Sequence, residues 1–268
     1  MNYNEWLARP FFSWLILVSV TLSLQNCPSH KKEESSSVEV FTPKTVRALV
    51  QHWKENYQGE VLLSYTFTQE TVRIRDGVAQ EPAIWEEAVQ YPSFFRIDLP
   101  KTEEGFNINL SRNDSVYVFR KGVIVDSSRQ IQQFMIMEGS LYFDPIDSTL
   151  SKLQEVGIDT NLLTLSQYEQ RPIYIIGAKE GDLTVPQIWL DAERRYNVRR
   201  FSRTGSGKLL EVRYSEFKAY EGHWMEHWLE FLVEGKMVQT ERYTDIDIHP
   251  KLSKETFDRQ QFDKHFWY

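Results

Sequence analysis

The chain has 268 residues, which is long enough for one large domain or two small ones with a buried core. Its formal net charge of −7 argues against a nucleic-acid-binding protein, because such proteins present a strongly basic face. The single cysteine excludes an intrachain disulfide framework and a multi-cysteine metal site.

An apolar run without charged residues extends from Pro10 to Leu24 near the N-terminus. It is shorter than the about 20 residues of a membrane-spanning helix and fits the apolar region of a signal peptide. The sequence Leu-Gln-Asn-Cys at residues 24–27 resembles a bacterial lipobox, in which Leu precedes the lipidated cysteine by three positions. We therefore expect a signal peptide over residues 1–26 and acyl chains on Cys27 that anchor the mature chain. The alternative is an uncleaved anchor, or an ordinary signal peptide with an incidental cysteine.

A polar segment separates this cysteine from the rest of the chain. Residues 29–37 consist only of Ser, His, Lys and Glu. Such a stretch cannot bury enough apolar surface to offset the entropy of ordering it. We expect a lipidated tether over residues 27–40 and a folded domain over residues 41–268.

The domain is predicted to open with one amphipathic helix and to continue as strands. Thr42 and Pro43 suit the start of the helix and Gly59 suits its end. Its apolar face consists of Val46, Leu49, Val50, Trp53 and Tyr57. From Val61 the apolar period changes to two, which is typical of a strand with one buried face.

About ten or eleven strands are predicted in sequence, which indicates a mainly β fold with some α (α+β) built on one curled antiparallel sheet. The segments from which these ten or eleven strands are expected are residues 61–68, 83–90, 94–99, 106–110, 115–119, 123–125, 173–176, 186–190, 196–203, 209–218, 223–233 and 236–248. Two amphipathic segments, residues 128–138 and 147–156, interrupt them.

Four short motifs follow one another along these elements. They are Phe-Thr-Gln at residues 67–69, Ile-Trp at 84–85, Tyr-Pro-Ser-Phe-Phe-Arg at 91–96 and Ile-Trp-Leu-Asp at 188–191. In this order they resemble the lipoprotein-sorting family of LolA and LolB, over about residues 43–258. In the third motif Tyr and Ser stand where the family has a basic residue and Asn, which puts the family's lid contacts in doubt here.

The resemblance implies an antiparallel half-barrel with an N-terminal helix and lid helices that close its mouth over an apolar cavity. The residues support this independently, because 14% of them are aromatic and a covered, curled sheet has an interior that must be filled or bind a ligand. Met135 and Met137 suit a lid, since flexible thioethers repack around variable ligands. The candidate cavity residues are Tyr65, Phe67, Trp85, Phe94, Tyr117, Phe119, Phe134, Met135 and Trp189. Ordinary core packing is the alternative for each of them.

These observations predict an envelope lipoprotein that binds acyl chains or lipoproteins, for lipoprotein sorting or lipid transfer without covalent chemistry. We expect a membrane-anchored protein on the periplasmic face or the surface of the outer membrane, with no enzymatic activity, cofactor, metal or nucleic-acid partner. The alternative is a structural or protein-interaction lipoprotein that uses the same sheet without a ligand.

One motif suggests a different chemistry. Residues 223–227 read His-Trp-Met-Glu-His, the H-x-x-E-H pattern of inverted zinc peptidases, in which both histidines share one helix face. The residues that follow have a strand-like composition, and on a strand the two imidazoles would lie roughly 13 Å apart. A zinc hydrolase at His223 and His227 is therefore the less favoured alternative.

Overall fold

The computed structural model describes residues 40–102, 105–261 and 264–268. Helix α1 (Val46–Tyr57) is the predicted N-terminal helix, and it buries Val46, Leu49, Val50 and Trp53. Its cap is Thr45 and not Thr42, because the Thr45 hydroxyl accepts a hydrogen bond from the Ala48 amide at 3.1 Å. The predicted signal peptide, Cys27 and nearly all of the tether lie outside the described residues.

Fourteen strands in the described part of the chain form one antiparallel sheet. Its order is β7-β6-β5-β4-β3-β1-β16-β15-β12-β11-β10-β9-β8, with β2 paired to the end of β1. The first-half strands are β1 (Ser64–Arg75), β2 (Val78–Ala79), β3 (Ala83–Gln90), β4 (Phe94–Thr102), β5 (Gly105–Arg112), β6 (Ser115–Arg120) and β7 (Val123–Arg129). The others are β8 (Leu163–Tyr168), β9 (Arg171–Ile176), β10 (Gln187–Asp191), β11 (Asn197–Arg203), β12 (Leu209–Ser215), β15 (Trp228–Val233) and β16 (Lys236–Asp247).

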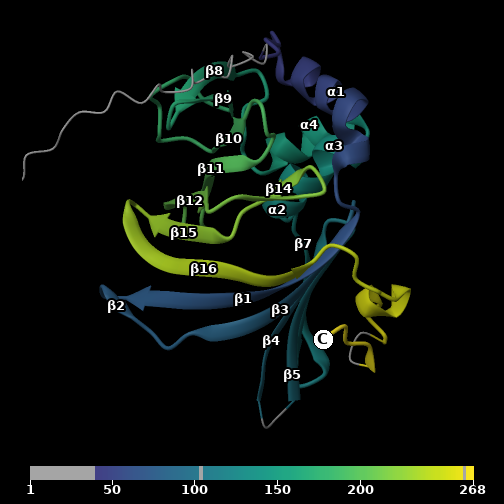
Figure 1. Ribbon diagram of the computed structural model, residues 1–268. Coiled ribbons are helices and arrows are strands. Elements are labelled where there is room, and N and C mark those ends of the chain that lie inside the picture. The colour runs from purple at the N-terminus through teal and green to yellow at the C-terminus, as the bar shows by residue number, and fades with distance from the viewer. Residues whose placement is uncertain (1–39, 103–104, 262–263) are drawn as a thin grey trace, which may run out of the picture. The chain divides into compact units, whose positions relative to one another are not determined.

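The sheet curls without closing, with β7 and β8 as its two ends (Figure 1). This confirms the predicted α+β fold with a curled, open antiparallel sheet. The sheet has more strands than expected because β2 and β8 give weak sequence signals: β2 has two residues, and β8 is partly exposed throughout. The strands predicted at residues 209–218 and 223–233 are each divided in the structure. Their inner parts form a separate hairpin of β13 (Lys218–Tyr220) and β14 (His223–Met225), which lies between β12 and β15 in the chain.

Helical turns follow the end strand β7. They are α2 (Gln133–Met135), a π-helical turn (Ile136–Ser140), α3 (Leu141–Phe143) and α4 (Ile146–Glu155), and we call residues 133–155 the lid segment. The predicted helix at residues 147–156 corresponds to α4, whereas the segment predicted at 128–138 begins inside β7 and becomes helical only at Gln133. Helix α1 contacts α3 and α4, and Figure 1 shows the three helices at one end of the sheet.

Strand alternation divides the core between the two faces of the sheet. On the face covered by α1 and the lid segment, one large cluster includes Trp53, Tyr65, Phe67, Leu141 and Tyr174. The opposite face carries two smaller clusters. One of them is covered by the C-terminal 3-10 helix (Lys254–Phe257), whose Phe257 packs on Phe94 with ring centroids 5.4 Å apart.

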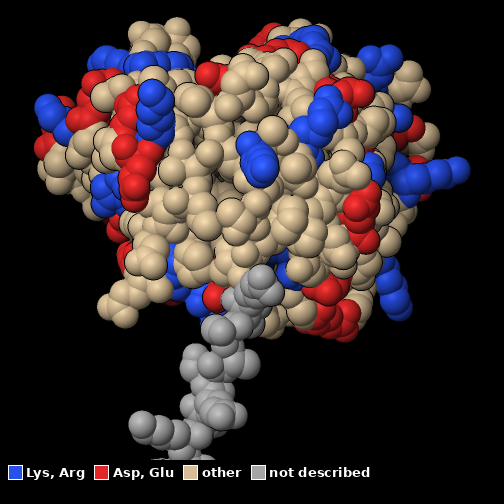
Figure 2. All heavy atoms as spheres, turned by 90° about the horizontal axis from the view of Figure 1, so that it is seen from above, with Lys and Arg blue, Asp and Glu red and all other residues tan. Residues whose placement is uncertain are grey.

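Charged side chains of both signs share the face of the molecule that Figure 2 shows. On that face Lys and Arg lie among Asp and Glu near the rim, and a blue side chain also stands within the mostly tan central area. Arg47 on α1 and Asp147 on α4 form an exposed ion pair. Mixed charge of this kind differs from the continuous basic surface that nucleic-acid binding requires.

Candidate ligand-binding site

A cavity of about 190 Å³ lies on the lid-covered face of the sheet. Its lining combines strands from both halves of the sheet with residues at the start of the lid segment. These residues are Phe67, Gln69, Trp85, Glu87, Phe95, Ile97, Gln132, Phe134, Arg200, Tyr214, Leu229, Phe231, Glu241 and Tyr243. The curl of the sheet explains why β4 and β11, which are far apart in the strand order, line one space.

Aromatic rings form much of the cavity wall. Phe134 comes from α2 and packs against Phe95 on β4, with ring centroids 5.3 Å apart. Phe67 on β1 packs against Tyr243 on β16 at 4.4 Å. Because Phe134 belongs to the lid segment and the other rings belong to the sheet, displacement of α2 would widen the cavity.

A polar stripe, which we define as Gln69, Glu87, Arg200 and Glu241, interrupts the aromatic wall. Burial raises the pKa of Glu241 to about 7, although Gln239 donates to this carboxylate at 2.6 Å and the Tyr243 hydroxyl donates at 3.2 Å. Burial also holds the pKa of Glu87 well above its ordinary value, and the neighbouring carboxyls of Glu241 and Glu86 raise it further. Among the described residues, Oε1 of Glu87 and Nε of Arg200 are buried without a hydrogen-bond partner.

Five of the predicted cavity residues lie on the lid-covered face. Phe67, Trp85 and Phe134 line the cavity. Tyr65 and Met135 pack in the same core cluster beside it. Their role in binding a ligand remains a proposal.

The structure places the other four predicted residues on the opposite face of the sheet. Phe94, Tyr117 and Phe119 point to the opposite face, where they pack with Phe257. Trp189 also lies on that face and donates a hydrogen bond to Gln187 at 2.8 Å. The reason is that successive side chains of a strand point to opposite faces of the sheet. Each of these rings belongs to the set that points away from the lid segment.

Several cavity residues were missed from sequence. Trp85 and Glu87 share one face of β3, where they pair with Gln69 and Phe67 of β1. Parity alone would have placed Glu87 beside Trp85, but a carboxylate in an alternating strand normally indicates the solvent face. For Arg200 the local sequence offered no signal, because its position in the cavity depends on the curl of the whole sheet.

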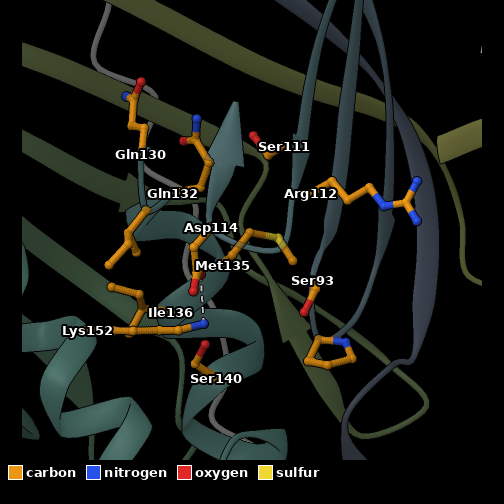
Figure 3. Close-up of a pocket in the computed structure, with 12 residues that line it drawn as sticks. Ser93, Ser111, Arg112, Asp114, Gln130, Gln132, Met135, Ile136, Ser140 and Lys152 are labelled. Atoms are coloured by element: carbon orange, nitrogen blue, oxygen red, sulfur yellow. Dashed lines mark ion pairs between the residues drawn. The ribbon is translucent and has the colours of Figure 1, made fainter. Parts of the chain in front are cut away.

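A second hollow lies where the lid segment leaves the sheet (Figure 3). Its volume is about 20 Å³, enough for one water molecule, and Met135 and Ile136 form part of its wall. Lys152 on α4 pairs there with Asp114 at 2.8 Å and with Asp144 at 2.9 Å. Since Asp114 stands in the β5–β6 turn, this ion pair ties the lid segment to the sheet.

Two further buried carboxyls are Glu138, in the π-helical turn of the lid segment, and Glu226, which follows β14. Glu138 accepts a hydrogen bond from Asn197 at 2.6 Å, and its Oε2 lies 3.7 Å from Nε2 of His223. Burial and the neighbouring Glu226 raise the pKa of Glu138, while burial raises the pKa of Glu226 to about 7. Burial also lowers the pKa of His223 to about 4, so that this imidazole is neutral at pH 7.

The His-Trp-Met-Glu-His segment forms part of a hairpin and not the helix that the zinc motif needs. His223 lies in β14 and faces Glu138. His227 instead lies 3.0 Å from the Tyr220 hydroxyl through Nε2 and 3.0 Å from the Tyr243 carbonyl through Nδ1. The two imidazoles therefore have separate partners, as the strand interpretation predicts.

Within the described ranges, no helix combines the length and apolar character needed to cross a membrane. No protein-family model and no curated protein sequence matches the chain.

Solved structures do match the fold. A LolA superfamily protein from Nitrosomonas europaea is 12% identical, with 78% of this chain and 97% of that chain covered and a TM-score of 0.53. A domain from Vibrio parahaemolyticus, described as an outer membrane lipoprotein-sorting protein, is 9% identical, with 81% and 97% covered and a TM-score of 0.54. A DUF1329 family protein from Desulfovibrio piger is 12% identical, with 81% and 99% covered and a TM-score of 0.56. The resemblance seen in the sequence is thus confirmed at the level of architecture: the chain has the LolA-like fold.

Proposed function

We propose that this protein binds acyl chains of a lipid or lipoprotein in the cavity between its sheet and its lid segment, without covalent chemistry. The observation that carries the proposal is the cavity itself, with aromatic walls from the sheet and Phe134 from the lid segment. Apolar pockets with a few placed polar groups are the usual form of a small-molecule site. The LolA-like fold is consistent with this use of the interior.

The size of the cavity indicates how such a ligand enters. An apolar cavity of about 150 Å³ holds one benzene ring, so 190 Å³ accommodates one ring-sized group or the first carbons of one chain. A complete acyl chain therefore requires the lid segment to move. Phe134 is the residue whose displacement enlarges the cavity, since its ring closes the space against Phe95.

Anchoring and location form the outer part of the proposal. Acyl chains on Cys27 would hold the domain at a membrane of the cell envelope, on the periplasmic face or at the outer-membrane surface, and residues 27–40 would act as a tether. An anchored protein receives or holds its ligand beside that membrane, in a role in lipoprotein sorting or lipid transfer.

A structural or protein-interaction role remains a second candidate because of the sheet's end strand β7. Val123, Ile124 and Val125 are 60%, 46% and 56% exposed, respectively. An exposed apolar strand at a sheet edge can pair with another chain. This candidate uses the sheet without a ligand.

Native mass spectrometry of the full-length protein purified from membranes separates the two candidates. Acyl-chain binding predicts a co-purified lipid or lipopeptide, released on unfolding. Protein that carries no lipid and takes up none on incubation with a lipid extract would support the interaction role instead.

A further inference from the structure

The polar stripe is not needed for holding a hydrocarbon chain. Aromatic and aliphatic walls are sufficient for that purpose, whereas each buried polar group must find a partner or carry a desolvation cost. Gln69 meets this need internally by donating to Thr71 at 2.7 Å, and Glu241 accepts from Gln239 and Tyr243. Two atoms of the stripe remain unsatisfied within the described residues, namely Oε1 of Glu87 and Nε of Arg200.

These two atoms differ in what they offer a ligand. Nε of Arg200 is a hydrogen-bond donor that belongs to a guanidinium cation. The Glu87 carboxyl is only 2% exposed, and burial raises its pKa, which favours the protonated form that can both donate and accept a hydrogen bond. Both residues line the same cavity.

The charge of the stripe indicates the sign of the missing partner. Burial favours the neutral form of both Glu87 and Glu241, whereas Arg200 carries a guanidinium cation. Protonation of the two carboxyls leaves the stripe with the positive charge of Arg200. An oxygen acceptor, charged or strongly dipolar, complements this arrangement.

We propose that the polar stripe binds the carbonyl end of the acyl ligand, with Arg200 donating through Nε to its oxygen and Glu87 completing the contact. The hydrocarbon then runs along the aromatic wall toward Phe134. This assignment rests on the proposed function and makes the site selective for acyl groups over plain hydrocarbon chains. The oxygen comes either from a free fatty-acid carboxylate or from an amide or ester carbonyl of a lipoprotein or lipid.

The first test uses wild-type, full-length protein stripped of lipid, with displacement of a fluorescent fatty acid as the readout. Dodecanoate and dodecanol have the same chain and differ in the polar end. A purely apolar cavity favours the uncharged alcohol, because burying an unpaired carboxylate is penalised. The polar stripe reverses this order, and we expect dodecanoate to displace the probe at a concentration about tenfold lower than dodecanol.

The second test changes the donor. Arg200→Met keeps the length of the side chain but removes the charge, and we expect its affinity for dodecanoate to fall about tenfold to hundredfold, while dodecanol binds as before. Arg203→Met is the matched control on the same strand, since Arg203 is exposed and donates to the backbone carbonyls of Gly207 and Thr184. Arg200→Gln replaces the Met variant if that variant does not fold.

An N-dodecanoyl dipeptide distinguishes the two sources of the oxygen. If Arg200→Met lowers the affinity for both dodecanoate and the dipeptide, the site recognises any acyl carbonyl. If it lowers the affinity for dodecanoate alone, the site recognises the carboxylate. Equal losses for dodecanoate and dodecanol, or no loss for either acyl ligand, would overturn the assignment but leave acyl binding intact. If wild-type protein binds none of these probes, the proposed function fails as well.

Discussion

Asn197 on strand β11 donates a hydrogen bond of 2.6 Å to Glu138 in the π-helical turn of the lid segment. Both residues are buried, at 3% and 8% exposure. The bond joins the lid segment, whose movement the proposed function requires, to the sheet. Opening the lid segment therefore exposes a carboxyl whose neutral form burial now favours.

Asn197→Leu should destabilise the folded protein. The substitution leaves the Glu138 carboxyl buried without this donor, which costs about 1–3 kcal/mol in the free energy of unfolding. Urea unfolding followed by tryptophan fluorescence measures the change. Asn161→Leu, at an exposed position, is the control and should shift stability by less than about 0.5 kcal/mol. Equal effects at both positions would show that the bond to Glu138 contributes nothing.

Glu241 should make the protein less stable as pH rises. Its pKa of about 7 in the folded state lies above its ordinary value of 4.5. The folded state binds the Glu241 proton more tightly than the unfolded state does, and this difference stabilises the fold. The stabilisation is complete below about pH 4.5 and is lost as pH rises through 7. The difference between the two pKa values corresponds to roughly 3 kcal/mol in the free energy of unfolding. Glu241→Gln should therefore be more stable than wild type at pH 8 by an amount of this order.

The comparison between the variant and wild type isolates this effect. His223 acts in the opposite sense between about pH 4 and 6.5, because burial lowers its pKa to about 4 and acid then favours the unfolded state. Glu226 acts in the same sense as Glu241 and is present in both proteins. Urea unfolding at pH 5 and pH 8 provides the measurement, and a variant-minus-wild-type difference that does not change with pH would refute the prediction.

The sequence predicted the sheet well but assigned its faces incompletely. Period-two alternation locates β1, β3 and β4, and it shows that Phe94 and Phe95 lie on opposite faces. It does not show which face the helices cover. Phe94 looked like a cavity residue because the resemblance placed it in a motif, yet the C-terminal 3-10 helix builds a second apolar layer around it with Phe257.

The polar part of the site was not predictable from local sequence. Glu87 is an acidic residue in a strand, between Glu86 and Ala88. Such a residue usually faces solvent. Its burial depends on the lid segment and on β16, which are distant in sequence. Arg200 reaches the cavity only through the curl of the sheet, a property of the complete fold.

Arg96 should contribute strongly to the stability of the fold, because it joins β4 to the C-terminal segment. It is fully buried, forms two bonds to Asp98 at 2.6 and 2.7 Å, and donates to the Thr256 carbonyl at 2.8 Å. Arg96→Met leaves the Asp98 carboxylate buried without its cation, and we expect a loss of about 3–5 kcal/mol in the free energy of unfolding.

A double variant controls for the loss of the cation. Adding Asp98→Asn to Arg96→Met removes the uncompensated charge and should recover part of the stability. Chemical unfolding of the three proteins measures the difference. A double variant no more stable than Arg96→Met would mean that lost packing, and not the orphaned charge, accounts for the effect.

Cys27→Ala tests the anchor, which lies outside the described residues. Without acyl chains the protein loses the roughly 0.8 kcal/mol that each buried methylene contributes to membrane binding. We expect it to move to the soluble fraction or to persist as a precursor, as judged by fractionation and intact mass. Unchanged membrane partition together with no acyl mass on Cys27 would exclude the lipoprotein assignment.

Saturable binding of an environment-sensitive fluorescent fatty acid tests the central claim most directly. Wild-type protein should bind the probe and release it to a diacyl lipid. Trp85→Gln, which alters the cavity wall, should weaken binding about tenfold or more through lost apolar contact. Phe94→Gln on the opposite face should lower stability but leave affinity within about twofold. A folded wild-type protein with no saturable uptake of any acyl probe would contradict the account.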